Sequence, residues 1–368
     1  MRPDGFLIGY EIMKQWEQWL VGALLLSSAP AFAVVNGTDV DWSKQDNVVR
    51  LDSIQLDRPG SCTGTLVAGR FVMTAAHCLY NEGDVDSLMT SSGQAVSLSR
   101  SAFKYHPNYV EEDGVLSEDV GIIKLTQSLP VLNTQYLFDL NRDPFRKGEL
   151  ITLQGFGGTP QTLHQADFKL IDSKNTWYPF RMFADQINQS HTTGGDSGST
   201  WVNNSQIIGV HHGSSTTSVG SDDDIILVRE TYATNLHYAK DFLLETIDGW
   251  HYPTVVKTQN GKATVKIQSL HVNGIAPNAS VTGDVMLTGG TCETTGVLTA
   301  FQTCTYEIET ANDNAKGQLV LSEQEVIDIN PASESGGSSG DSGSSGGSLG
   351  WFGLLALVGL GARRKIWR

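Results

Sequence analysis

The chain has 368 residues, with 40 acidic side chains against 25 basic ones and a formal net charge of −15. Hydrophobic residues make up 39% of the sequence, which is enough for a packed core in more than one domain. So acidic a composition argues against non-specific binding to nucleic acid, and we expect no nucleic-acid partner.

The first 33 residues have the pattern of a signal peptide. A basic start at Met13-Lys14 precedes the apolar run 20–26, and the small-x-small sequence Ala31-Phe32-Ala33 follows it. We expect translation to begin at Met13 and signal peptidase to cut after Ala33. An N-terminal membrane anchor is the alternative, but the apolar run is short for a membrane span. The pattern therefore predicts export of the chain.

Short β-prone stretches follow, separated by Gly, Asn, Asp and Pro. Examples are residues 71–73, 121–125, 150–153 and 206–210. Such spacing is typical of antiparallel β-barrels. Residues 236–247 carry apolar side chains at helical spacing, so we expect a helix to close this region.

The composition changes after about residue 248. Further strand candidates are residues 262–269, 281–287, 305–309 and 318–321. We expect a small β-sandwich domain over residues 248–332, in which nothing looks catalytic. Cys292 and Cys304 lie close enough in sequence to form a disulfide that closes one loop. Such a bond stabilises the folded chain by about 3 kcal/mol, because it lowers the entropy of the unfolded state.

The C-terminal region combines a linker, an apolar run and a basic end. Residues 333–348 are nearly all Ser and Gly, a composition that predicts a flexible linker. The apolar run 349–362 and the cluster Arg363-Arg364-Lys365 come next. This order is typical of a short membrane segment with a cytoplasmic tail. The alternative, a buried helix, needs a partner domain on the far side of the linker.

Three motifs carry candidate chemistry, in the order His, Asp, Ser. They are Thr74-Ala75-Ala76-His77-Cys78, Asp119-Val120-Gly121-Ile122-Ile123-Lys124-Leu125 and Thr193-Gly194-Gly195-Asp196-Ser197-Gly198-Ser199. The glycines around Ser197 predict a tight turn that presents a hydroxyl beside backbone N–H groups. His77 can then take the proton of Ser197, while Asp119 orients the imidazole. The neighbouring Glu118 is a rival for the role of Asp119.

These motifs resemble those of the chymotrypsin-like serine proteases over residues 34–247. TAAHC and GDSGS match the signature strings of the family, and the apolar stretch directly after Asp119 matches its Asp-bearing strand. The resemblance implies an all-β fold of two antiparallel six-stranded barrels with a C-terminal helix. It implies a secreted serine endopeptidase that hydrolyses protein or peptide substrates through an acyl-enzyme, without a metal or cofactor. An inactive binding protein on the same fold is the rival class, and the intact triad positions argue against it.

Two further features of the catalytic region follow from this resemblance. The backbone N–H groups of Gly195 and Ser197 are implied to form the oxyanion hole. Cys62 and Cys78 match the disulfide that the family carries beside the catalytic His. The export signal also favours pairing of cysteines over free thiols.

Cleavage after Ala33 exposes a new N-terminus at Val34, which resembles the mature start of the family. In the family this ammonium enters the body of the protein and pairs with the Asp that precedes the catalytic Ser, which is Asp196 in this chain. A buried carboxylate needs such a partner. We therefore expect signal peptidase to make the activating cut.

The specificity pocket resembles that of the glutamyl endopeptidase branch. His191 occupies the position of the carboxylate in trypsin-like members, which does not support a trypsin-type pocket. The resemblance places Thr192 and His211 on the pocket wall, where they bind a substrate Glu carboxylate. His191 is a candidate second donor to that carboxylate, and Gly213 is a further substrate-binding candidate. We expect cleavage after Glu or Asp, with a pH dependence from protonation of His211. Trypsin-like or broad specificity is the alternative. In that case the pocket residues form hydrogen bonds only with one another and do not bind a substrate carboxylate.

Residues 346–368 resemble a GlyGly-CTERM sorting segment, with Gly346-Gly347, a short apolar helix and an Arg-rich end. The resemblance implies cleavage by a rhombosortase-like protease and export by the type II secretion machinery, or retention at the cell surface. Before this processing, the segment anchors the chain transiently in the inner membrane.

Overall fold

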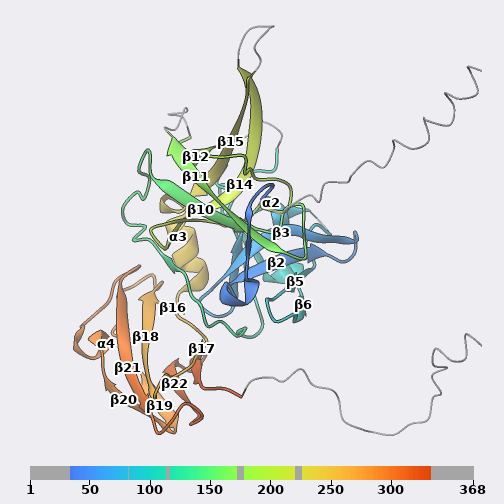
Figure 1. Cartoon of the computed structure of the whole chain (residues 1–368). Helices are drawn as coiled ribbons and strands as arrows, with labels where there is room; N and C mark the ends of the chain where they lie inside the picture. The colour runs from blue at the N-terminus through green and yellow to red at the C-terminus, as the bar shows by residue number, and fades with distance from the viewer. Residues whose placement is uncertain (1–33, 82, 113–116, 172–177, 220–225, 333–368) are drawn as a thin grey trace, which may run out of the picture. The chain divides into compact units, whose positions relative to one another are not determined.

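The computed structural model describes residues 34–81, 83–112, 117–171, 178–219 and 226–332 (Figure 1). The predicted signal peptide (1–33), linker (333–348) and sorting segment (346–368) lie outside these described residues. Within the described ranges, no helix has both the length and the apolar composition needed to cross a membrane.

The first half of the protease region is a single antiparallel sheet. Its strands are β2 (Val48–Ser53), β3 (Arg58–Val67), β4 (Phe71–Thr74), β5 (Ser87–Met89), β6 (Ala95–Ser97), β7 (Phe103–Tyr105) and β8 (Gly121–Lys124). The order is β6-β5-β2-β3-β4-β8-β7, and the edge strands β6 and β7 do not pair with each other in the described part of the chain. The closed six-stranded barrel expected here is thus an open half-barrel, because no pairing joins β6 to β7 among the described residues.

The second half is a barrel that closes. Its strands are β1 (Thr38–Val40), β9 (Tyr136–Leu137), β10 (Leu150–Gly155), β11 (Leu163–Ile171), β12 (Arg181–Gln186), β13 (Thr200–Asn203), β14 (Gln206–Val219) and β15 (Ile226–Asn235). The ring runs β11-β10-β13-β14-β15-β12 and returns to β11, while β1 and β9 pair outside it. This closed six-stranded barrel confirms the sequence-based expectation. β14 and β15 continue beyond the ring as a long hairpin (Figure 1).

The helices are short, apart from the one that closes the protease region. They are η1 (Trp42–Lys44), α2 (His77–Tyr80), η2 (Arg100–Ala102), α3 (Leu236–Ile247) and α4 (Thr291–Thr294). α3 has the predicted bounds. The Asn235 side chain accepts from the N–H of His237 at its start, and Asp248 ends it in the left-handed conformation, with φ 39°. Its apolar side packs into the core of the half-barrel.

Two four-stranded sheets form the predicted small sandwich. Their strands are β16 (Trp250–His251), β17 (Val255–Val256), β18 (Lys262–Ser269), β19 (Ser280–Gly283), β20 (Val285–Gly289), β21 (Thr303–Thr310), β22 (Gly317–Ser322) and β23 (Glu325–Ile329). The orders are β16-β18-β21-β20 and β17-β23-β22-β19. Alternate residues of both sheets, such as Ile267, Ile308 and Leu319, share one core. Cys292 and Cys304 form the expected disulfide.

A set of buried hydrogen bonds, which we call the seam, joins the sandwich to the protease region. The N–H of Ala68 donates to His251 Nδ1 at 3.0 Å, so the other ring nitrogen of His251 carries the proton and donates to the carbonyl of Gln135 at 2.9 Å. The side chain of Gln268 accepts from the N–H of Leu137 and donates to its carbonyl. The described residues from Val34 to Pro331 belong to one compact unit.

Candidate active site

A buried carboxylate holds the imidazole of His77. His77 begins α2, and Asp119 lies two residues before β8, which pairs with the strand that leads into α2. His77 Nδ1 lies 2.6 Å from Asp119 Oδ2, and the backbone N–H of His77 donates to Oδ1 at 2.9 Å. Asp119 is fully buried. Glu118, the rival residue, instead accepts from the side chain of Asn108 at an exposed position.

The pKa values of this pair follow from burial and mutual attraction. Burial alone lowers the pKa of His77, but the hydrogen bond and charge of Asp119 raise it above its ordinary value. Burial alone raises the pKa of Asp119, but hydrogen bonding and charge from His77 bring it below its ordinary value. The pair therefore favours an ionised Asp119 beside an imidazole that accepts a proton readily, as a general base must.

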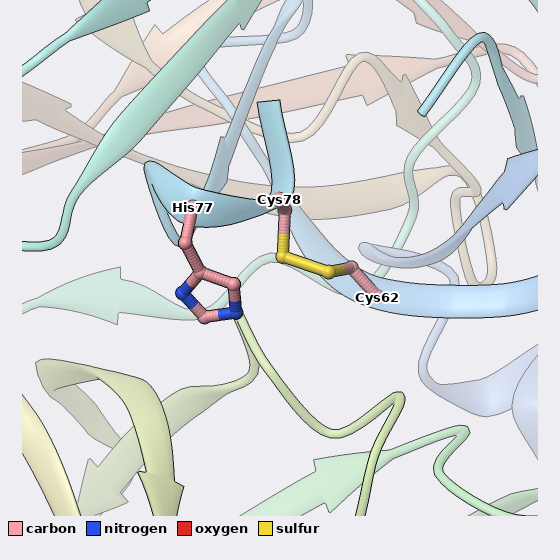
Figure 2. A group of neighbouring side chains, drawn as sticks. All are labelled: Cys62, His77 and Cys78. Atoms are coloured by element: carbon pink, nitrogen blue, oxygen red, sulfur yellow. A yellow bond between two sulfur atoms is a disulfide. The ribbon is translucent and has the colours of Figure 1, made fainter. Parts of the chain in front are cut away.

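The disulfide between Cys62 and Cys78 lies beside His77 (Figure 2). Cys78 follows His77 in α2, whereas Cys62 lies on β3, so the bond ties the histidine turn to the half-barrel. The two sulfur atoms and the imidazole are close neighbours. Because the sulfur atoms are bonded to each other, they are not thiolate ligands, and this group does not fit a metal site.

Ser197 lies on a tight turn just before β13. Gly198 has φ 84°, and a Cβ atom there would lie 2.0 Å from Thr74 Oγ1, so only glycine allows the turn to approach the end of β4. Thr63 fixes the turn from β3. Its N–H donates to the carbonyl of Ser197 and its hydroxyl to that of Gly195, both at 2.8 Å.

The hydroxyl of Ser197 faces the carbonyl of His212, with Oγ 3.4 Å from that oxygen. No hydrogen bond joins Ser197 to His77 within the described residues, so the serine must rotate its hydroxyl before His77 can take the proton. Catalytic hydrogen bonds are often long or poorly aligned before substrate binds. Among the described residues, the N–H groups of Gly195 and Ser197 have no hydrogen-bond acceptor. They are therefore free to donate to the oxyanion that forms during the reaction.

Asp196 is the second buried carboxylate of the region. It is fully buried and accepts from the N–H of Gly157 at 3.0 Å and of Thr193 at 2.8 Å. A third backbone hydrogen bond comes from Val34, which is itself fully buried. Burial raises the pKa of Asp196 to about 6 despite these three donors. The structure thus brings together the two residues of the expected activation pair.

A small cavity of about 40 Å³ lies beside the serine turn. It is lined by Phe168, Gln186, His191, Thr192, Ser214, Thr216, Arg229, Glu230 and Thr231. Two of the expected pocket residues, His191 and Thr192, therefore line it directly.

His211 lies behind this cavity rather than in its lining. Its Nδ1 is 3.3 Å from Thr231 Oγ1, which is 3.2 Å from Thr192 Oγ1 and from the carbonyl oxygen of Gly213. Burial, followed by the charges of His212 and His77, lowers the pKa of His211 to about 3. Burial thus favours the neutral imidazole of His211, and the pH dependence expected from its protonation beside a bound carboxylate stays a prediction.

Sequence reasoning missed Arg229 of β15 as a pocket residue. Arg229, Glu230 and Thr231 are consecutive residues of one strand, and all three line the cavity, so strand alternation does not single out Arg229. Its place in the lining follows only once β14 and β15 are known to form the pocket wall.

A family model and several known proteins match this chain. The family model described as Trypsin matches residues 43–236. Trypsin alpha-4 of Lucilia cuprina is 29% identical over 181 residues, which cover 43% of this chain and 69% of that protein. Proproteinase E of Bos taurus is 26% identical over 168 residues, covering 39% and 64%. The solved VesB protease of Vibrio cholerae is 18% identical, with a TM-score of 0.43, covering 80% of this chain and 98% of that one.

The fold and these matches define the class as a chymotrypsin-like serine protease. The chain belongs to the trypsin family, and it is a serine endopeptidase that acts on protein or peptide substrates.

Proposed function

We propose that Ser197, His77 and Asp119 form the catalytic triad of an exported endopeptidase. The observation that carries this proposal is the buried Asp119–His77 pair, 2.6 Å apart, beside the serine turn. As Ser197 Oγ attacks the scissile carbonyl carbon, His77 Nε2 takes its proton, and Asp119 stabilises the resulting imidazolium. The N–H groups of Gly195 and Ser197 donate to the oxyanion. His77 then protonates the leaving amine, and water hydrolyses the acyl-enzyme.

The specificity that we propose is cleavage after Glu, with Asp second. A carboxylate that enters a pocket loses water and must regain hydrogen bonds there. Thr192 and Ser214 offer hydroxyls at the cavity, and Arg229 adds a permanent positive charge. His211 supports Thr192 through Thr231 rather than touching the substrate. Glu230 lines the same cavity and is the residue on which a trypsin-like preference for basic side chains would depend.

Matched peptides with Glu, Gln, Arg or Phe before the cut bond test this specificity through kcat/KM. We expect Glu to exceed Gln by about 10- to 100-fold, because hydrogen bonds to a charged group are worth about 1.5–3 kcal/mol. Arg229→Gln reduces this ratio toward one. Glu230→Gln is the matched control, and it keeps or raises the preference for Glu. Faster cleavage after Arg or Phe defeats the acidic pocket and leaves the protease assignment intact.

The remaining proposal concerns domains and processing. We assign residues 34–247 to the protease domain and 248–332 to an accessory domain. Signal peptidase removes residues 1–33, and a rhombosortase-like protease cuts near Gly346-Gly347 before export by the type II secretion machinery. Its support is the order of Ser/Gly linker, apolar run and basic cluster in the sequence.

Intact-mass measurement of the secreted protein tests the C-terminal processing. We expect a chain that ends near Gly346. Replacing Arg363, Arg364 and Lys365 by Ser removes the basic end and lowers the secreted yield, whereas Ser-to-Ala changes within residues 333–345 serve as the control and have no effect. Soluble secreted protein that still carries Trp367-Arg368 contradicts the proposal.

A further inference from the structure

A second imidazole lies beside the carboxylate of Asp119. His212 Nδ1 is 3.3 Å from Asp119 Oδ2, the same oxygen that lies 2.6 Å from His77 Nδ1. The two rings are 5.5 Å apart, and their planes are inclined at 37°. One carboxylate oxygen therefore faces two imidazoles, although general-base catalysis needs it to orient only His77.

Arg181 of β12 lies on the other side of His212. Its Nη2 is 3.1 Å from His212 Nδ1, and its side chain is almost completely buried. The guanidinium stacks on the ring of Tyr232, 4.5 Å from the centroid, and His212 meets the same ring edge-on. Asp119, 3.3 Å from the same nitrogen, can only accept and favours a proton on Nδ1, but it lies farther from Nδ1 than Arg181, which can only donate and needs Nδ1 to accept. This contact selects the neutral imidazole of His212, with its proton on Nε2.

The surroundings of His212 explain why a proton on Nδ1 is unfavourable. The titratable and charged groups that face it are Asp119, His77, Arg181, the phenol of Tyr232 and the neighbouring His211. Burial lowers the pKa of His212 to about 4. The charges of Arg181 and His77 act in the same direction, and only Asp119 opposes them.

We propose that Arg181 and His212 are positioning residues for Asp119: Arg181 donates to His212 Nδ1, keeps this imidazole neutral and thereby reserves the carboxylate for His77. This inference rests on the proposed catalytic triad. If a proton from solvent binds His212 Nδ1, the new N–H competes with His77 for Asp119 Oδ2. The contact with Arg181 opposes that protonation, because two cations would then face each other.

The pH profile of kcat/KM in three variants tests the inference. In the wild type, activity falls at acidic pH with a logarithmic slope of about one, because His77 alone takes up a proton. Arg181→Met removes the donor and the charge, so His212 titrates at higher pH and the slope steepens toward about two. Arg181→Lys keeps the charge and should keep the wild-type slope. The double variant Arg181→Met/His212→Asn should return to a slope of about one.

Nitrogen chemical shifts of the histidine side chains in the wild-type protein give a test that needs no variant. We expect His212 to show an unprotonated Nδ1 at neutral pH. A protonated Nδ1, an unchanged profile in active Arg181→Met, or a steep slope that persists in the double variant overturns the inference. Each of these outcomes leaves the triad standing, because the triad fails only if Ser197→Ala retains activity.

Discussion

Replacing Ser197 by Ala is expected to lower kcat by roughly a millionfold, the scale on which triad serines contribute in unrelated serine proteases. The reason is the arrangement of the site. The Asp119–His77 pair can remove a proton only from a group that then attacks the substrate, and a methyl group cannot attack. Ser199→Ala is the matched control. Its hydroxyl, two residues away, is buried without a hydrogen-bond partner in the described residues, so its removal should leave kcat near the wild-type value.

Covalent labelling by a fluorophosphonate probe, which reacts with activated serines, tests the role of Ser197 without a measurement of turnover. The wild type and Ser199→Ala should be labelled, and Ser197→Ala should not. His77→Ala should also lose labelling, because the serine then has no base. Full activity in folded Ser197→Ala, purified free of other proteases, would contradict this assignment. Another residue would then have to act as the nucleophile.

The second large effect is on the pH dependence of stability, which should change when the chain is cut before Val34. In a chain that still carries Ala33, Asp196 is buried with only backbone donors, and its pKa is about 6 against 3.8 for a free Asp. A pKa that is raised in the folded state favours folding at low pH, and this contribution is lost as pH rises through the folded value. The difference corresponds to about 3 kcal/mol, lost mainly between pH 4 and 6.

Cleavage before Val34 should abolish this loss. The backbone N–H that already contacts Asp196 becomes an ammonium, which stabilises the carboxylate and lowers its pKa. The measurement is the free energy of unfolding against pH for two chains, one that begins at Val34 and one that keeps Ala33. Asp196→Asn is the control, and in the chain that keeps Ala33 it should remove the loss of stability between pH 4 and 6. Identical profiles without that substitution, or an active secreted enzyme that begins at another residue, rule out the activation pair.

Local sequence strings predicted the parts of the site that depend on one segment and its neighbours. The position of His77 and the pairing of Cys62 with Cys78 follow from motifs whose residues are adjacent in the chain or across one strand pair. The bounds of α3 were predictable because apolar side chains recur at helical spacing from Leu236 to Ile247, and the structure ends the helix at the caps Asn235 and Asp248.

The rest depended on strand register, which single segments do not specify. Arg181, His212 and Tyr232 come from three strands that meet only in the closed barrel, so no local pattern places the guanidinium against the imidazole. The open half-barrel was missed for a related reason. Closure depends on whether the edge strands β6 and β7 pair with each other, which the alternation of apolar residues within one segment does not determine.

The seam between sandwich and protease region has a consequence for biosynthesis. The N–H groups of Ala68 and Leu137 find their buried acceptors on His251 and Gln268, which are made much later. A nascent chain that stops before Gln268 lacks part of the seam even when its triad residues are already synthesised. The protease region therefore gains the full stabilisation of the seam only after most of the polypeptide has emerged from the ribosome.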